Sequence, residues 1–151
     1  MNKRMTLAVL ILIVAAGAMA FIRLAPTDPS LWHLALDPRP LDIATPSPDK
    51  VTGLPNGAYA DLIAAPDQSQ ALLAKLDGIA LATPRTIRIA GSAETGRITW
   101  QTRSAFWGFP DYTTAESTPE GVTLYARQRF GAGDWGVNAA RLTAWISAFN
   151  A

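Results

Sequence analysis

Residues 86–103 read TIRIAGSAETGRITWQTR, and this stretch decides the fold that we expect. Before its glycine-bounded turn, polar and apolar side chains alternate, so that Ile87 and Ile89 share one face. After the turn the alternation resumes, and Ile98 and Trp100 again share a face. An alternation with a period of two is typical of a strand with one buried face. The stretch therefore predicts two antiparallel strands joined by a short turn.

The same pattern continues toward the C-terminus. Further strands are expected over 112–117 and 122–130, and the turn between them has Pro119 in its second place and Gly121 in its fourth. Because short connections make consecutive strands antiparallel neighbours, the four strands form a meander. An apolar stripe with helical spacing predicts a final helix over 138–149, and its members are Leu142, Trp145, Ile146 and Phe149.

A shorter helix precedes the strands, with Asp67 as its candidate N-cap and Gly78 placed to end it. The predicted fold class is therefore α+β, a four-stranded antiparallel meander covered by the C-terminal helix. One N-terminal transmembrane helix completes the prediction.

The N-terminal helix is predicted from residues 5–22, which are almost wholly apolar. As a helix this run is about 27 Å long, close to the thickness of a bilayer core. Lys3 and Arg4 precede it, and both residues would stay on the cytoplasmic side. A signal peptide cleaved after Ala20 is the alternative. We favour the uncleaved anchor because the run stays apolar through Ile22. Both alternatives export the rest of the chain to the periplasm of a bacterium, and the anchor places it on the inner membrane.

Residues 26–66 contain eight of the eleven prolines, so we expect an extended linker there. The predicted organisation is an anchor over 1–25, a linker over 26–66 and a folded domain over 67–151. His33 is expected to be solvated or interfacial. Four apolar linker residues are expected either to dock on the domain or to sit at the lipid interface, namely Trp32, Leu34, Leu36 and Leu41.

The composition of the 151 residues excludes several classes of function. There is no cysteine and a single histidine, which removes thiol chemistry, serine–histidine catalysis and histidine-rich metal sites. The formal charge is +1, without the basic surplus of a nucleic-acid-binding protein. We therefore expect no cofactor, no metal ion and no nucleic acid.

Two motifs carry a resemblance to a known family. Residues 103–112 read RSAFWGFPDY, and residues 129–141 read RFGAGDWGVNAAR. Together they resemble the domain of unknown function 1499 family, over roughly residues 66–149. The chain departs from the family pattern at Tyr112, where a second aspartate is usual, and at Tyr125 and Ala126, where Arg-Ser is common. The resemblance implies a small exported or membrane-associated bacterial protein and no established activity.

Charged residues of the two motifs are the first candidate site, and they are Arg103, Asp111, Arg129, Asp134, Asn138 and Arg141. With Arg127, they are expected to cluster at one end of the sheet. Mutual pairing would fix the loops, with Asn138 capping the last helix and Asp134 bound to loop amides or an arginine. Alternatively, the arginines hold the carboxylates of a partner. The glycine loop lacks the lysine of a nucleotide loop, and an acid–base pair of Asp111 and Asp134 is disfavoured by the neighbouring arginines.

Aromatic residues are the second candidate site, and they are Trp100, Trp107, Phe109, Trp135 and Trp145. They serve either as core packing or as the walls of an apolar groove under the final helix. Ser104 has no base in its segment and is not expected to be a nucleophile.

Three functions follow from these features. The first is a non-catalytic, membrane-anchored periplasmic module that binds an apolar small molecule, a lipid or an envelope partner. The second is a structural or protein-interaction domain that docks through its Arg/Asp loops. The third and least favoured is a hydrolase that uses Asp111 and Asp134.

Overall fold

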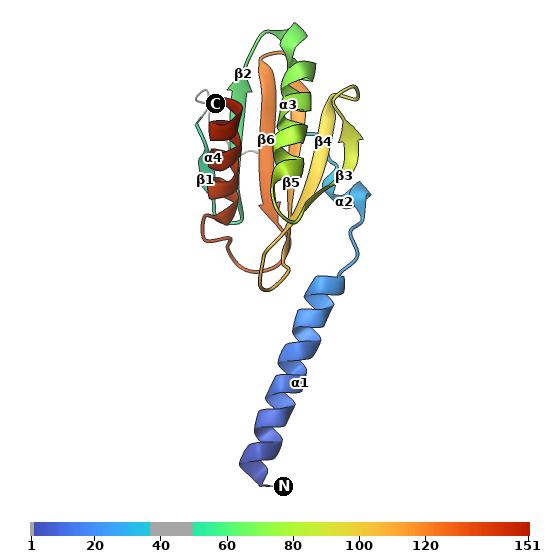
Figure 1. Ribbon diagram of the computed structural model, residues 1–151, viewed down its shortest axis with the longest axis vertical. Helices are drawn as coiled ribbons and strands as arrows, with labels where there is room; N and C mark the ends of the chain where they lie inside the picture. Colours follow the sequence, from blue (N-terminus) through green and yellow to red (C-terminus); the bar gives the residue numbers. More distant parts are fainter. Residues whose placement is uncertain (1, 37–49) are drawn as a thin grey trace.

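The computed structural model describes residues 2–36 and 50–151. Their main feature is a six-stranded antiparallel sheet with two helices on one face (Figure 1). The strand order is β1-β2-β6-β5-β4-β3. The α+β class is therefore confirmed, and the sheet is larger than the four strands that we expected.

The predicted meander forms the larger part of the sheet. It consists of β3 (Thr86–Ser92), β4 (Arg97–Arg103), β5 (Pro110–Thr118) and β6 (Gly121–Gln128), each antiparallel to the next. Ile98 and Trp100 of β4 are fully buried, as their shared face predicts. β3 is an edge strand with a bulge between Arg88 and Ala90, and Ile87 is exposed. The bulge interrupts the alternation that we read in this strand.

The linker that we expected over 26–66 is wrong for part of its length. β1 (Thr52–Leu54) and β2 (Gly57–Ile63) lie inside it, and β2 pairs with β6 along its whole length. β2 is free of proline, and six of its seven residues are buried. Pro55 lies in the turn between the two strands, outside the ladder. The high proline content of the wider window concealed a strand that prolines only flank.

Helix α3 (Ser69–Ala82) is longer than expected and starts later. Asp67 does not cap it but lies in a preceding single turn, η1 (Pro66–Gln68). Gly78 is inside the helix, which continues past it and buries Ala80. Packing of this last turn on the sheet outweighs the weak helix propensity of one glycine. Pro84, two residues beyond the helix, ends the helical run instead.

Helix α4 (Val137–Phe149) lies beside α3 on the same face of the sheet (Figure 1). α4 covers β1, β2 and β6, whereas α3 covers β3 to β6. The expected stripe of α4 faces the sheet, with Leu142, Trp145 and Ile146 buried and Phe149 packed at the border. The core between sheet and helices is therefore closed by both helices, and not by the C-terminal helix alone.

Helix α1 (Lys3–Leu24) projects away from the sheet (Figure 1). Of the described residues, it is the one helix long and apolar enough to cross a membrane. None of its residues is buried within the protein. It is either a signal anchor or a signal peptide, and its C-terminal end adjoins the loops that follow β4 and β6.

Residues 25–36 follow α1 and lie on the sheet face opposite α3 and α4. We call them the docking segment. They include one short helix, α2 (Pro29–Trp32), whose first turn is capped by the side chain of Asp28. Ala25 and Leu36, at the two ends of the segment, are buried. The sheet is therefore covered on both faces, by helices on one and by this segment on the other.

Candidate functional site

The six charged and polar candidates are divided by the sheet into two groups. Asp111, Asp134, Asn138 and Arg141 meet at the N-terminus of α4, on the helix-covered face. Arg103 and Arg129 lie on the opposite face, where both bind the chain that follows α1. The single cluster that we expected is thus two separate networks.

Asp134 caps helix α4. Its Oδ1 accepts a hydrogen bond from the amide of Gly136 at 3.0 Å, and its Oδ2 accepts one from the amide of Asn138 at 3.1 Å. The amide of Asn138 belongs to the first turn of α4 and that of Gly136 directly precedes it, so neither amide has a partner inside the helix. A carboxylate there is further favoured by the helix dipole. Asp134 therefore binds loop amides, as one of our alternatives held, and the expectation that Asn138 is the cap is wrong.

Arg141 joins Asp111 and Asn138. Its Nη2 lies 3.1 Å from Oδ2 of Asp111, and its Nη1 donates to Oδ1 of Asn138 at 2.5 Å. Burial raises the pKa of Asp111, and the hydrogen bond and charge of Arg141 oppose this rise. The network ties the start of β5 to the first turns of α4.

Three arginines hold the docking segment on the other face. Arg103 donates to the carbonyl oxygen of Ala25 at 3.4 Å, Arg129 to that of Pro26 at 2.6 Å, and Arg127 to that of Trp32 at 2.8 Å. Carbonyl groups of an irregular segment need such donors, because no strand or helix partner satisfies them. The guanidinium, with five donors in a fixed fork, is suited to this task. In residues 2–36 and 50–151, none of the three arginines has a carboxylate partner.

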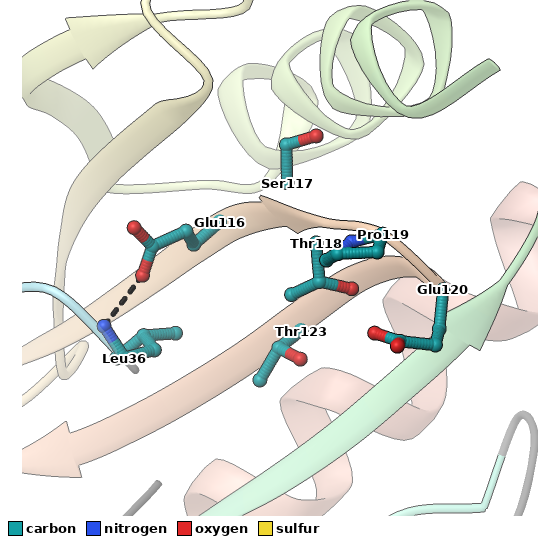
Figure 2. Close-up of a pocket in the computed structure, with 7 residues that line it drawn as sticks. All are labelled: Leu36, Glu116, Ser117, Thr118, Pro119, Glu120 and Thr123. Carbon is teal, nitrogen blue, oxygen red and sulfur yellow. Dashed lines mark hydrogen bonds between the residues drawn. The ribbon is translucent and has the colours of Figure 1, made fainter. Parts of the chain in front are cut away.

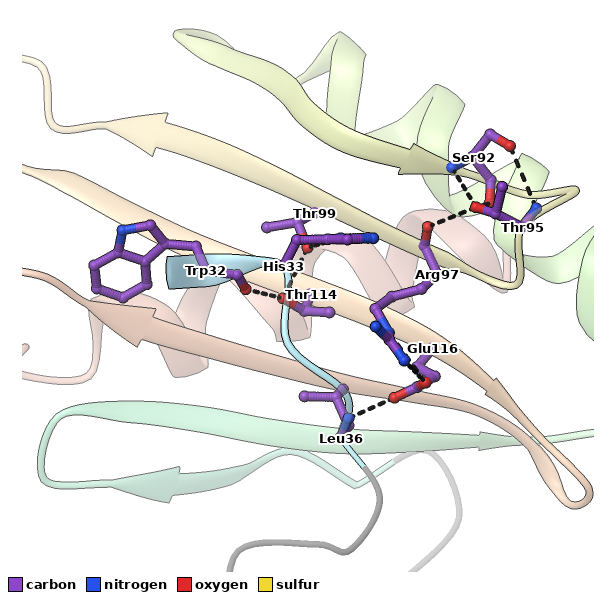
Figure 3. A network of polar contacts seen from close by, with 9 residues as sticks. All are labelled: Trp32, His33, Leu36, Ser92, Thr95, Arg97, Thr99, Thr114 and Glu116. Carbon is purple, nitrogen blue, oxygen red and sulfur yellow. Dashed lines mark hydrogen bonds and ion pairs between the residues drawn. The ribbon is translucent and has the colours of Figure 1, made fainter. Parts of the chain in front are cut away.

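The His33 side chain and main-chain groups of Trp32 and Leu36 bind polar residues of β4 and β5 (Figure 3). Nδ1 of His33 is 2.9 Å from Oγ1 of Thr99, and Thr114 donates to the carbonyl of Trp32 at 3.2 Å. The amide of Leu36 donates to Glu116, which also pairs with Arg97. Leu34 is exposed, and Leu41 lies outside the described residues.

The expectation that His33 is solvated or interfacial is wrong. Its ring is partly covered by the sheet, and burial, followed by the nearby charge of Arg97, lowers its pKa, which Glu116 opposes. Trp32 stacks on Tyr112, whose hydroxyl also lies 3.1 Å from Oγ1 of Thr27. These contacts could not be predicted from the linker sequence, because each contact joins residues more than sixty positions apart in the chain.

The five aromatic candidates do not line one groove. Trp100 and Trp145 are buried in the core, where their rings meet edge to face with centroids 5.5 Å apart. Trp107 and Phe109 lie in the loop between β4 and β5, and Trp135 lies in the loop before α4. The side chain of Trp135 is 98% exposed, and that of Trp107 is 49% exposed. The loops that carry these residues lie at the end of the sheet toward α1 (Figure 1), and the β4–β5 loop contacts Arg23.

Two hollows open on the described part of the chain, one beside Leu36 of the docking segment and one beside Arg23 of α1. One, of about 330 Å³, follows the turn between β5 and β6 (Figure 2) and is lined by Leu36, Glu116, Ser117, Thr118, Pro119, Glu120 and Thr123. The other, of about 380 Å³, lies at the end of the sheet near α1. Its lining residues are Arg23, Arg85, Ile87, Gln101, Arg103, Ser104, Ala105 and Gly108. Of the residues that line this second hollow, only Arg103 and Ser104 were considered as functional candidates from the sequence.

A family model described as Protein of unknown function (DUF1499) matches residues 39–149. The chain belongs to the DUF1499 family. The matched range begins well before residue 66, where we placed the start of the resemblance, and it includes β1 and β2. No curated protein and no solved structure matches this DUF1499 chain.

The DUF1499 domain groups no three His, Asp or Glu side chains for a metal ion within residues 2–36 and 50–151. Ser104, which we did not expect to be a nucleophile, accepts a hydrogen bond through Oγ from the amide of Phe109 at 2.9 Å. This bond closes the loop between β4 and β5 that carries Phe106, Trp107 and Phe109, which we call the aromatic loop. The arrangement offers cationic and aromatic groups at the end of the sheet next to α1.

Proposed function

We propose that this DUF1499 protein is a non-catalytic module, anchored in the bacterial inner membrane by α1, that binds lipid at the periplasmic surface of the bilayer. The observation that carries the proposal is the position of the loop with the exposed residues Phe106 and Trp107 beside the end of α1. Arg23, in the last turn of α1, donates to the carbonyl of Phe106, and Phe21 lies edge to face against Phe130 at 6.2 Å. An anchor that ends at residue 24 brings these loops to the membrane surface.

The chemistry of the loops supports this placement. Phe106 is 68% exposed, and with Trp107 and Trp135 it presents three large aromatic side chains to solvent. Large exposed apolar side chains that lie together, such as Phe106 and Trp107, often mark a surface that contacts a membrane or a partner. Tryptophan is favoured at the interface between water and lipid, where its ring meets apolar material and its N–H meets water.

The charged groups near α4 favour this proposal over the two alternatives. Both carboxylate oxygens of Asp134 are used in capping, and Asp111 is paired with Arg141. Neither carboxylate is therefore available as the base of a hydrolase. Arg141 is likewise occupied by Asp111 and Asn138, which weakens the proposal of a protein partner that docks through this part of the Arg/Asp loops.

Quenching of tryptophan fluorescence in the full-length protein tests the proposal. Nanodiscs would carry lipids brominated near the headgroup, and we expect strong quenching of the wild type. The double variant Trp107→Phe/Trp135→Phe should lose most of this quenching, whereas Trp145→Phe, which changes a core residue, should keep it. Equal quenching of the wild type and the double variant would overturn the proposal.

A further inference from the structure

The hollow near α1 is lined by three guanidinium groups that come from three different elements. Arg23 belongs to the last turn of α1, Arg85 to the connection between α3 and β3, and Arg103 to the end of β4. No carboxylate lines this hollow. Within residues 2–36 and 50–151, none of the three arginines is in an ion pair. The hollow is therefore a concentration of positive charge without an internal counter-charge.

The three arginines are held in different ways. Arg103 is fixed by carbonyl groups, including that of Gly108 at 3.0 Å. Arg85 donates only through Nε, to the carbonyl of Arg103 at 3.1 Å, so its two terminal nitrogens have no partner in the described part of the chain. Arg85 also has a positive φ of 59°, which is costly for a residue with a Cβ atom. Strained backbone of this kind is concentrated at functional sites.

The surroundings of the hollow match the edge of a bilayer. Arg23 lies at the end of the apolar helix, and its side chain contacts Gly108 within the aromatic loop. Ile87, which is exposed, and Ala105 supply an apolar wall beside the guanidinium groups. A volume of about 380 Å³ is within the usual size range of small-ligand sites.

We propose that this hollow binds the phosphate group of an anionic lipid headgroup. Guanidinium groups bind phosphate oxygens in bidentate fashion, and the free end of Arg85 offers such a fork. A headgroup with a net negative charge is preferred over a zwitterionic one, because no choline or ethanolamine cation then competes with the arginines. This inference rests on the proposed function, which brings the hollow to the membrane surface, and it adds the headgroup chemistry.

The test uses full-length protein in nanodiscs of mixed phosphatidylglycerol and phosphatidylcholine. Native mass spectrometry of the released protein counts the retained lipids. We expect the wild type to retain phosphatidylglycerol preferentially and Arg85→Gln to reduce this retention about tenfold, as the loss of one charge-assisted interaction predicts. Arg85→Lys, which keeps the charge, should restore part of it.

Arg88→Gln is the matched control. Arg88 lies three residues along the chain but pairs with Asp77 of α3 at 3.2 Å, on the other face of the sheet. Its replacement should leave lipid retention unchanged. Equal retention by the wild type and Arg85→Gln, or an equal loss in Arg88→Gln, would overturn the assignment of the site.

A second arm separates lipid from soluble phosphate. Inorganic phosphate is titrated into the wild type and Arg85→Gln in nanodiscs of phosphatidylcholine alone. Saturable binding that needs Arg85, without enrichment of phosphatidylglycerol in the first arm, would assign the site to a soluble phosphate and overturn the lipid source. Persistent quenching of Trp107 and Trp135 with no headgroup preference would overturn this inference alone, whereas lost quenching would overturn the proposed function.

Discussion

The indole ring of Trp32 stacks on the phenol ring of Tyr112, with the ring centroids 3.9 Å apart and the planes inclined by 14°. This contact joins the docking segment to the centre of the sheet across eighty residues of sequence. Arg127 closes over the same indole at 5.6 Å from its centroid and donates to the carbonyl of Trp32. One tryptophan therefore organises stacking, a cation–π contact and a main-chain hydrogen bond.

Trp32→Ala should release the docking segment. Stacked aromatic pairs contribute about 0.5–1.5 kcal/mol beyond the area that they bury, so residues 25–36 should exchange amide hydrogens markedly faster. Hydrogen–deuterium exchange with mass spectrometry measures this directly. Leu34→Ala, at an exposed position in the same segment, is the control and should exchange like the wild type. Unchanged exchange in Trp32→Ala would contradict the role that we give to the stack.

Trp145→Ala should be strongly destabilising and Trp135→Ala nearly neutral. The first removes a buried ring in contact with Trp100, at a cost of about 3–5 kcal/mol. The second removes a ring that is 98% exposed and should change stability by less than about 0.5 kcal/mol. Urea unfolding followed by circular dichroism compares them. Similar losses in both variants would place Trp135 inside the fold, against the structure.

Asp134→Ala should destabilise α4 by about 1 kcal/mol, because the amides of Gly136 and Asn138 at its N-terminus lose their acceptor. Asp134→Ser, which keeps an acceptor at this position, should recover part of the loss. Asp67→Ala is the matched control, since Asp67 is exposed and lies outside α3. Thermal unfolding of the three variants measures the difference in stability. An equal loss of stability in Asp67→Ala would contradict the capping role that we give to Asp134.

Docking of residues 25–36 should weaken at acidic pH. Burial and the charge of Arg97 lower the pKa of His33 in the docked state, so the undocked segment takes up a proton first as the pH falls. Docking is then at full strength above the ordinary histidine pKa of about 6.5 and weakens as the pH falls from there toward the lower value of the docked state. Amide exchange of residues 25–36, compared at equal intrinsic rates, should show this between pH 7.5 and pH 5.

His33→Gln keeps a polar side chain that cannot be protonated and should remove this pH dependence. Persistence of the dependence in the variant would assign it to a group other than His33.

The meander and α4 could be predicted because their signals are local. The alternation around Ile98 and Trp100 and the spacing of Leu142 and Trp145 each report one buried face, and each is buried as expected. β2 was missed because its neighbours contain proline, although GAYADLI itself contains none. Its pairing with β6 spans about sixty residues, and no local pattern carries that information.

The candidate sites were harder to predict, because their chemistry depends on which face of the sheet a side chain occupies. Arg103 and Asp111 are close in sequence and were assigned to one cluster, but they lie on opposite faces. Arg85 gave no signal, since an arginine after a proline is unremarkable in a sequence. Its importance arises only from the fold, which brings it to Arg23 and Arg103.

With the anchor that we propose, the direct passage from α1 into the docking segment sets the height of the domain above the membrane. An extended linker over residues 26–66 would have let the domain reach about 130 Å from the bilayer. Instead, Ala25, the first residue after the helix, is already buried against the domain. In the anchored chain that we propose, the domain is therefore held close to the lipid surface, with little freedom to move away from it. A ligand or partner of the anchored domain would therefore have to lie in the membrane or at its surface.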